Sequence, residues 1–355
     1  MNKFDVIVIG GGQSGLATGY YLRRTGLTYV ILDNQREAGG AWLHAWESLK
    51  LFSPGQWSSL PGMMMTAGAA DYPGRNVVIE YLENYERKYN LQIKRPVEVL
   101  KVTKENDVFI VETSDGIYHG NAVVSATGTF ANPVFPAFKG MALFQGKVIH
   151  SAQYRNAGDF INSRVAVVGE GNSGAQILAE VSKVTATLWI TQKEPRFYPD
   201  NIDGRYLFDA ATQMYQAQKA GKQYKPPSLA DIVMVDSVKE ARSRKVFQNL
   251  PPFESLTKDS IVWRDGREEK IDAIIFCTGF KPSIKHLEPL NVMNGDSKAD
   301  TTGTKSNLVA GLWFVGYGNW TGFASATLIG VGRSAKATAE EVGKYISTLK
   351  ESQLI

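Results

Sequence analysis

The sequence predicts an α/β protein built from two Rossmann-like dinucleotide-binding domains, each with a parallel sheet. Two observations predict this fold. A buried-strand pattern, a G-x-G-x-x-G turn, a helix pattern and a second buried strand follow one another twice along the 355 residues. In both copies, 18 residues separate the last glycine of the turn from the end of the second strand, from Gly15 to Asp33 and from Gly174 to Gln192. This strand–turn–helix–strand context is the one in which the glycine motif indicates nucleotide binding.

The first unit starts with residues 4–9, a nearly continuous β-branched run that is typical of a strand buried in a parallel sheet. The turn at 10–15 comes next. A helix pattern at 16–24 and an apolar strand at 28–32 follow, and the strand ends at Asp33. The second unit repeats this order, with expected elements at 164–168, 169–174, 175–182 and 186–191.

The remaining sequence predicts smaller elements around these two units. Residues 97–125 alternate short strands with turns, as in a β-meander, and a hairpin is expected around residues 265–266. A further strand is expected at 312–315, and a final helix from Gly322 onward. Residues 196–255 lack clear periodicity, so we interpret them as an insertion with some helix and as a candidate lid.

Each glycine of the motif has its own physical task. The first permits a tight turn, the second lets the backbone approach a pyrophosphate, and the third lets the helix pack against the strand. The helix N-terminus then offers free N–H groups to the phosphates. The sequence therefore predicts two phosphate-binding turns, formed by Gly10, Gly12 and Gly15 and by Gly169, Gly171 and Gly174.

The residues that end the second strand of each unit differ in charge. Asp33 can accept a hydrogen bond from a ribose 2′-hydroxyl, and its spacing favours this over a simple strand-end cap. The second unit has Gln192 and Lys193 at the matching place. Lys193 can neutralise a 2′-phosphate, which favours NADPH, whereas Gln192 can bind an unphosphorylated ribose and tolerate NADH. Two such units in one chain predict FAD in one and NADPH, NADH or both in the other.

We expect the NAD(P)H-binding domain to be inserted into a discontinuous FAD-binding domain. The expected FAD-binding domain comprises residues 1–155 and 275–355. The expected NAD(P)H-binding domain comprises residues 156–274, with the candidate lid at 196–255 inside it.

Composition excludes several other classes of protein. Charged residues make up 21% and are interspersed, so the net charge of +4 forms no basic run of the kind that binds nucleic acid or a membrane surface. The apolar strand pattern begins at Phe4, which argues against a signal peptide, and no apolar run reaches the roughly 20 residues of a membrane span. One cysteine, Cys277, and four scattered histidines predict neither a disulfide nor a metal site, and we expect a cytoplasmic protein.

Residues 144–154 match the pattern F-x-G-x-x-x-H-x-x-x-[FY], from Phe144 through His150 to Tyr154. In this the chain resembles the class B flavin-containing monooxygenases, and most closely their short bacterial members, including those encoded beside arsenic-resistance genes. The resemblance extends over essentially the whole chain. Tyr154 favours the branch that oxygenates heteroatoms, because the Baeyer–Villiger branch usually has Trp there. For His150 the resemblance implies a role in coupling, and a buried structural histidine is the alternative.

The resemblance also implies further cofactor contacts. Trp320 to Phe323 are expected to open the last helix, whose N-terminal amides can face the flavin, although Asn319 or Thr321 can cap that helix instead. The remaining FAD contacts implied are Gly40, Trp42, Val99 and Thr127. In the second unit, Asn172 and Ser173 of the glycine turn are added to the NAD(P)H contacts.

One position departs from the pattern of the resembled family. Many members have an Asn after the Gly-Gly-x-Trp motif that supports the flavin hydroperoxide, and Phe52 stands roughly at that place here. Phe52 cannot donate a hydrogen bond to a peroxide. It can exclude water and pack on the flavin, or it can be a core residue.

We expect a monooxygenase in which NAD(P)H reduces FAD, the reduced flavin adds O2, and the C4a-hydroperoxide passes oxygen to a soft nucleophile. Thioethers, amines, ketones and trivalent arsenicals are open as small-molecule substrates. The oligomeric state is open as well, and the resemblance to the family suggests a homodimer. The alternative is a non-oxygenating NAD(P)H oxidase or flavin redox sensor that releases hydrogen peroxide. A disulfide reductase is excluded because it needs two redox cysteines, and a G-x-S-x-G hydrolase because Leu16 and Ala175 replace the final glycine.

Overall fold

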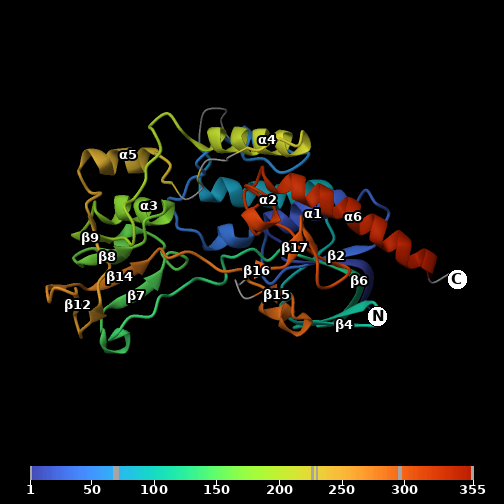
Figure 1. The fold of residues 1–355 in the computed structure, drawn as a ribbon, viewed down its shortest axis with the longest axis horizontal. Coiled ribbons are helices and arrows are strands. Elements are labelled where there is room, and N and C mark those ends of the chain that lie inside the picture. The colour runs from blue at the N-terminus through green and yellow to red at the C-terminus, as the bar shows by residue number, and fades with distance from the viewer. Residues whose placement is uncertain (1, 67–71, 225–227, 229–230, 295–297, 353–355) are drawn as a thin grey trace. The chain divides into compact units, whose positions relative to one another are not determined.

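In a computed structural model that describes residues 2–66, 72–224, 228, 231–294 and 298–352, the chain forms two compact units. Both contain a parallel sheet with helices, as Figure 1 shows, so the predicted α/β fold class is confirmed. The first unit is discontinuous, as expected. It consists of residues 1–43, 54–132 and 281–355, and the second of residues 44–53 and 133–280.

The larger sheet of the first unit runs in the order β17-β18-β19-β6-β1-β2-β3, and its central strands are parallel. The antiparallel meander β4-β5-β6 branches from it at β6, as the alternation at 97–125 predicted. The strands are β1 (Asn2–Ile9), β2 (Tyr29–Leu32), β3 (Ile93–Lys94), β4 (Val99–Glu105), β5 (Val108–Thr113), β6 (Gly116–Ser125), β17 (Thr301–Thr302), β18 (Lys305–Ser306) and β19 (Leu312–Phe314). A separate pair joins β15 (Met293–Asn294) and β16 (Lys298–Ala299).

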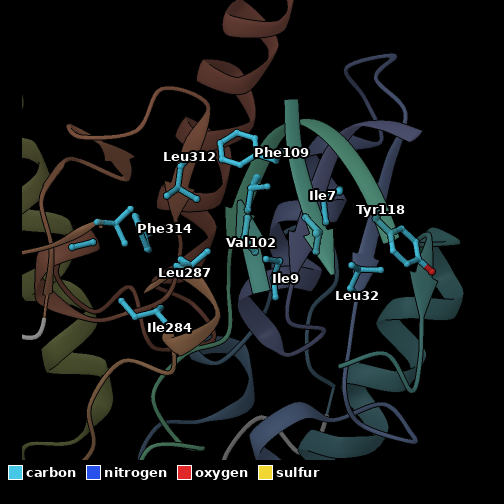
Figure 2. Close-up of a cluster of buried hydrophobic side chains, with 14 of the residues drawn as sticks. Ile7, Ile9, Leu32, Val102, Phe109, Tyr118, Ile284, Leu287, Leu312 and Phe314 are labelled. Atoms are coloured by element: carbon cyan, nitrogen blue, oxygen red, sulfur yellow. The ribbon is translucent and has the colours of Figure 1, made fainter. Parts of the chain in front are cut away.

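Side chains alternate across β1, so the two faces of this sheet pack against different partners. Ile7 and Ile9 belong to a buried apolar cluster that also takes in the meander and the 3₁₀ helix η5 (Lys285–Leu290), as Figure 2 shows. Val8 points the other way, towards helix α1 at Gly15. One face of this sheet is therefore covered by the meander and η5, and the other by α1. The glycine turn connects β1 to α1.

The described residues of the first unit form the helices α1 (Gln13–Leu22), α2 (Arg75–Tyr89) and α6 (Val331–Ser352). Helix α2 was not predicted from the sequence. The expectation that the last helix opens at 320–323 was wrong, because α6 begins at Val331 and residues 319–321 form only the single 3₁₀ turn η6 (Asn319–Thr321). Gly322 and Ala324 have φ of +121° and +59°, which a right-handed helix does not allow.

The sheet of the second unit is parallel throughout, in the order β10-β9-β8-β14-β7. Val165 and Val167 face the cluster of α3 and α5, while Ala166 and Val168 face a small antiparallel sheet, β11-β12-β13. The strands are β7 (Lys147–His150), β8 (Val165–Val168), β9 (Thr187–Ile190), β10 (Asn249–Leu250), β11 (Ser255–Leu256), β12 (Ser260–Val262), β13 (Glu268–Lys270) and β14 (Ala273–Phe276). The expected hairpin at 265–266 is the connection from β12 to β13.

The helices of the second unit are α3 (Asn172–Val181), α4 (Gly204–Lys219) and α5 (Asp236–Ser243). Both α4 and α5 lie in the region 196–255 that was interpreted as an insertion with some helix. Short 3₁₀ turns complete the chain, namely η1 (Gly40–His44), η2 (Gly55–Trp57), η3 (Met141–Leu143) and η4 (Ala157–Phe160). Within the described ranges no helix is long and apolar enough to cross a membrane.

The boundaries between the two units differ from the expected domain limits at three segments. Strand β7 pairs with β14 in the second sheet, so residues 133–155 and 275–280 group with the second unit. Residues 44–53 also group with it, although the sequence on both sides of them belongs to the first unit. The boundaries of the units thus depend on contacts between segments that are far apart in the sequence, such as the pairing of β7 with β14.

The buried histidine of η5 predicts a pH dependence of stability. Burial lowers the pKa of His286 to about 4 from 6.5, and its Nε2 atom has no partner among the described residues. Below pH 6.5 the unfolded state therefore binds a proton that the folded state does not, so stability falls as the pH falls from 6.5 towards 4. We expect urea unfolding to give a free energy about 2 kcal/mol lower at pH 5 than at pH 7 from this group. His286→Leu should remove most of that difference, and an equal loss in both proteins would contradict the assignment.

Candidate nucleotide-binding sites

The first glycine turn is held by close backbone contacts that only glycine permits. Gly10 has a φ of +106°, and a Cβ there would lie 2.6 Å from the carbonyl oxygen of Ala126 at the end of β6. A Cβ on Gly15 would overlap the carbonyl oxygen of Gly10. The turn is therefore fixed against the neighbouring strand and the start of α1, as the motif predicted.

The middle of this turn leaves room for a ligand. A Cβ on Gly12 would meet only the Cα of Gly40, at 3.8 Å, and Gly12 caps α1 without any side-chain hydrogen bond. Gly40, with a φ of +55°, approaches Gly12 from the other side. Open space beside uncapped helix amides fits the pyrophosphate of a dinucleotide.

Asp33 lies beside this turn and is only 3% exposed. A Cβ on Gly11 would lie 2.5 Å from Asp33 Oδ2, so the carboxylate fills the space of a side chain at position 11. Arg95 holds Asp33 with its Nε and Nη2 atoms 3.0 and 2.9 Å from Oδ2. The same guanidinium donates to both oxygens of Glu86 on α2, at 2.7 and 2.8 Å. Arg95 thus fixes the carboxylate that is predicted to bind the ribose.

Neither Arg95 nor Glu86 was found from the sequence. Arg95 lies 62 residues after Asp33, in a segment without a recognisable motif. The one signal in the sequence is that a buried acid needs a partner, which does not say where the partner lies.

The other predicted FAD residues of the first unit are placed around the same strand ends. Trp42 Nε1 donates to Gln13 Oε1 of the turn at 3.4 Å, and Thr127 Oγ1 donates to the carbonyl of Ser283 at 2.8 Å. Thr127 Oγ1 also lies 2.7 Å from the hydroxyl of the buried Tyr317. Val99 begins β4 and packs against the apolar cluster of the sheet.

Asn319 and Thr321 lie in the 3₁₀ turn η6, and neither caps α6. The Thr321 hydroxyl accepts from the Tyr317 amide at 3.0 Å and lies 3.1 Å from the Gly318 carbonyl. The turn is therefore held by Thr321, and its amides are not those of a long helix N-terminus.

The second glycine turn repeats the backbone contacts of the first. Gly169 has a φ of +134° and its Cβ would overlap the carbonyl oxygen of Cys277 at the end of β14, while a Cβ on Gly174 would overlap the carbonyl of Gly169. A Cβ on Gly171 would meet nothing within 4 Å. This turn therefore also fits a pyrophosphate. Burial raises the pKa of the Cys277 thiol to about 12, so it stays protonated at neutral pH.

The remaining predicted NAD(P)H residues are placed differently. Asn172 uses its side chain within the protein, because Nδ2 donates to the Asp231 carbonyl at 3.1 Å and Oδ1 accepts from the Val233 amide at 2.9 Å. Ser173 lies in the first turn of α3. Gln192 and Lys193 are both exposed just beyond β9.

His150 ends β7 and is fully buried. Its Nδ1 atom accepts from the Ala152 amide at 3.2 Å, and its ring meets those of Phe135 and Phe280 with centroids 5.4 and 4.9 Å away. Burial lowers its pKa, so the ring is neutral at pH 7. These contacts favour a structural histidine that shapes the end of the strand.

Phe52 contacts the insertion of the second unit. Its ring lies 6.2 Å from that of Phe208 on α4, nearly parallel to it at 26°, and its carbonyl accepts from the Gly204 amide at 2.8 Å. A Cβ on Gly204 would lie 2.7 Å from the Phe52 ring. Phe52 therefore supports the start of α4 within this unit.

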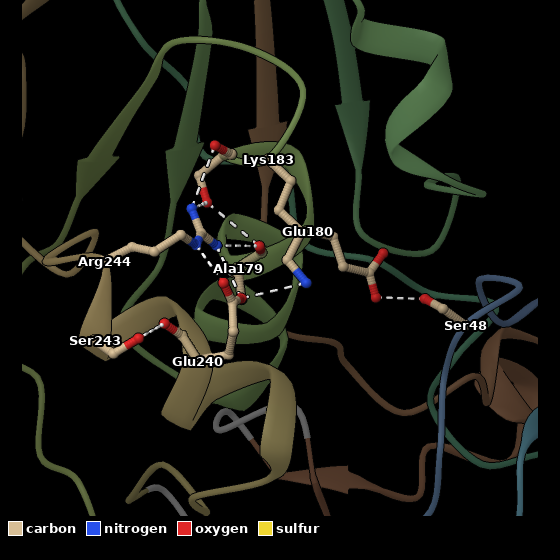
Figure 3. Close-up of polar contacts among 8 residues, drawn as sticks. Ser48, Ala179, Glu180, Lys183, Glu240, Ser243 and Arg244 are labelled. Carbon is tan, nitrogen blue, oxygen red and sulfur yellow. Dashed lines mark hydrogen bonds and ion pairs between the residues drawn. The ribbon is translucent and has the colours of Figure 1, made fainter.

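Residues 44–53, which carry Phe52, are held within the second unit by Glu180 of α3 and by Arg155, which follows the fingerprint. The Tyr154 hydroxyl donates to Glu180 Oε2 at 3.0 Å, and Ser48 donates to Glu180 Oε1, as Figure 3 shows for Ser48. Arg155 binds the carbonyl of His44. In the same figure Arg244, which caps the C-terminus of α5, donates to the carbonyl of Ala179 in α3 at 2.9 Å.

A family model described as pyridine nucleotide-disulphide oxidoreductase matches residues 7–316. The chain belongs to this family. A flavin-containing monooxygenase from Stenotrophomonas maltophilia is 45% identical, with a TM-score of 0.89 over 97% of this chain and 99% of that one. An uncharacterized CzcO-like oxidoreductase from Geobacillus kaustophilus is 30% identical over 348 residues, 95% of this chain and 98% of that protein.

The pyridine nucleotide-disulphide oxidoreductase fold itself serves more than one chemistry. A bacillithiol disulfide reductase from Bacillus cereus has a TM-score of 0.75 at 18% identity, over 96% of this chain and 99% of that one, which shows the shared fold alone. Within the family this chain is an oxidoreductase of the flavin-containing monooxygenase type, with FAD and NAD(P)H as its cofactors. The resemblance stated from the fingerprint is confirmed.

The Arg95 contacts predict an effect on FAD affinity. In Arg95→Lys, one ammonium cannot bind Asp33 and both Glu86 oxygens together, so Asp33 loses its fixed orientation. We expect the dissociation constant for FAD to rise about tenfold, roughly 1.4 kcal/mol, in a fluorescence titration of the FAD-free protein. Arg87→Lys, an exposed change one residue from Glu86, is the control. Equal effects of the two changes would show that Arg95 does not act on Asp33.

The Phe52 contacts predict an effect on α4. Phe52→Asn removes the ring contact and puts an amide against Phe208, which should lower the free energy of unfolding by about 1–3 kcal/mol. Hydrogen exchange in α4 should accelerate. Phe52→Leu, which keeps an apolar side chain, should retain most of the stability. Unchanged exchange in α4 for Phe52→Asn would mean that this contact contributes little.

Proposed function

We propose that this protein uses NAD(P)H and O2, through its FAD, to oxygenate soft nucleophiles: thioethers to sulfoxides, amines, and ketones by Baeyer–Villiger oxidation. The observation that carries the proposal is a pair of complete nucleotide cradles in a chain with a single cysteine. That cysteine, Cys277, is a protonated thiol beneath the second turn. Thiol–disulfide exchange needs a thiolate, and the protonated Cys277 does not provide one, so in this proposal electrons from NAD(P)H go to another acceptor.

The residues of the two units have separate tasks in this proposal. When bound, FAD supplies hydride acceptance and the activation of O2. The turn at Gly10, Gly12 and Gly15 binds its pyrophosphate, and Asp33, fixed by Arg95, binds its ribose. The turn at Gly169, Gly171 and Gly174 binds NAD(P)H. The protein itself positions the cofactors and excludes water, and it needs no acid–base pair of its own.

The similar Stenotrophomonas protein supports the oxygenating reaction, since it is described as a flavin-containing monooxygenase. A second candidate function is a non-oxygenating NAD(P)H oxidase or flavin redox sensor that releases hydrogen peroxide. The Phe52 side chain favours this alternative, because it offers no hydrogen bond at the position where the resembled family has Asn. The two candidate functions differ in their products: a monooxygenase transfers one oxygen atom of O2 to the substrate, whereas an oxidase releases both as hydrogen peroxide.

The deciding experiment is a turnover assay with FAD-loaded protein and an aryl methyl sulfide. NADPH and NADH are supplied separately, and sulfoxide formed and hydrogen peroxide released are counted per nucleotide oxidised. We expect sulfoxide to account for most of the nucleotide consumed. An amine and a cyclic ketone run in parallel show which class reacts fastest. Peroxide alone with every class, at full nucleotide consumption, would replace the monooxygenase proposal with the oxidase.

A further inference from the structure

The two glycine turns differ at one position that the motif does not specify. The first turn reads Gly10-Gly11-Gly12, and the second reads Gly169-Glu170-Gly171. In the first turn, position 11 has no room for a side chain, because the Asp33 carboxylate fills that space from the end of β2. In the second turn the equivalent residue carries a carboxylate of its own.

Glu170 directs that carboxylate to the end of β9. Its Oε2 atom accepts a hydrogen bond from the backbone amide of Gln192 at 3.3 Å. The sheet register makes Thr191 the counterpart of Asp33, because Leu32 and Ile190 both accept a hydrogen bond from the first glycine of their turn, and Gln192 is the next residue along the chain. A carboxylate therefore lies between the glycine turn and the strand end in both units, supplied by the strand in the first and by the turn in the second.

We propose that Glu170 is the ribose-recognising and cofactor-selecting residue of the second unit. The inference rests on the proposed use of this unit for NAD(P)H. A carboxylate at this place accepts hydrogen bonds from the adenosine 2′-hydroxyl of NADH. It repels the 2′-phosphate of NADPH, which carries a charge close to −2 at neutral pH. The exposed Lys193 acts in the opposite direction, so the two residues together set the preference between the nucleotides.

The chain provides a matched control for the charge of Glu170. Glu194 is also a carboxylate just beyond β9, two residues after Gln192, but it is exposed and reaches Asn249 at 3.5 Å. Glu194→Gln removes the same charge from the same end of the strand without changing the space between the turn and Gln192. A difference in nucleotide binding between Glu170→Gln and Glu194→Gln is therefore due to the position of the lost carboxylate and not to the loss of one charge.

The test is calorimetric titration of FAD-loaded protein with 5′-ADP and with adenosine 2′,5′-bisphosphate, which represent the adenosine ends of NADH and NADPH. FAD occupies the first unit, so the probes report the second. We expect Glu170→Gln to weaken the binding of 5′-ADP and to strengthen the binding of the bisphosphate. The ratio of the two dissociation constants should shift at least about tenfold in favour of the bisphosphate. Glu194→Gln should shift the ratio less than about twofold.

A double variant tests the placement directly. Glu170→Gly with Thr191→Asp rebuilds the arrangement of the first unit, with the acid directly after the strand and glycine in the turn. This variant should recover the preference for 5′-ADP that Glu170→Gln loses. Recovery would support the proposal even if the single variant binds both probes weakly.

Two results would overturn the inference, and they are distinguishable. If both probes bind and the ratio is the same in wild type, Glu170→Gln and Glu194→Gln, Glu170 does not select the nucleotide, while the proposed function stands. If neither probe binds wild-type protein and NAD(P)H does not reduce its FAD, the second unit is not a nucleotide site and the proposed function fails as well.

Discussion

The contact between a glycine turn and the carbonyl that ends a neighbouring parallel strand is the constraint on which both units depend. At Gly10 the partner is Ala126, and at Gly169 it is Cys277. Each contact sets how far the turn extends beyond its sheet, and so where the first amides of the helix point. Thr127 and Thr278 follow these carbonyls and donate to backbone oxygens, so a side-chain hydrogen bond also holds each strand end. A side chain at either glycine would displace the whole nucleotide cradle.

Features determined by neighbouring residues were predictable from the sequence. Glycines that adopt positive φ, β-branched strands and a fixed spacing act within about 30 residues, so both units were found with small errors in their bounds. The final helix was placed too early because residues 319–330 have apolar and small side chains compatible with a helix. Their conformation is instead decided by turns at Gly322 and Ala324 with positive φ. Helix α2 was missed although its buried residues Val78, Tyr81, Leu82 and Tyr85 repeat at the spacing of a helix.

In the candidate sites, too, residues of local motifs were predictable and contacts between distant segments were not. The glycines and Asp33 were identified because the motif requires those residue types at those spacings. Partners from distant segments were not identified. Arg95 reaches Asp33 from the segment between β3 and β4, and Phe208 reaches Phe52 from the insertion. The side chain of Asn172 is bound by the backbone of Asp231 and Val233. Glu170 lies within the second glycine motif, but the sequence does not show that it has a role. That role follows from comparison with Gly11, where Asp33 fills the space of a side chain.

Because of residues 44–53, each of the two units is built from more than one segment of the chain. The chain passes from one unit to the other four times, at residues 43/44, 53/54, 132/133 and 280/281. A fragment containing only residues 133–280 would lack Trp46, which is part of the apolar core of the second unit, and Ser48, which binds Glu180. Neither unit can therefore be expressed, exchanged or recombined as one continuous module. A hybrid with another nucleotide-binding domain must carry both segments together, which restricts how such proteins can be shuffled by engineering or by gene fusion.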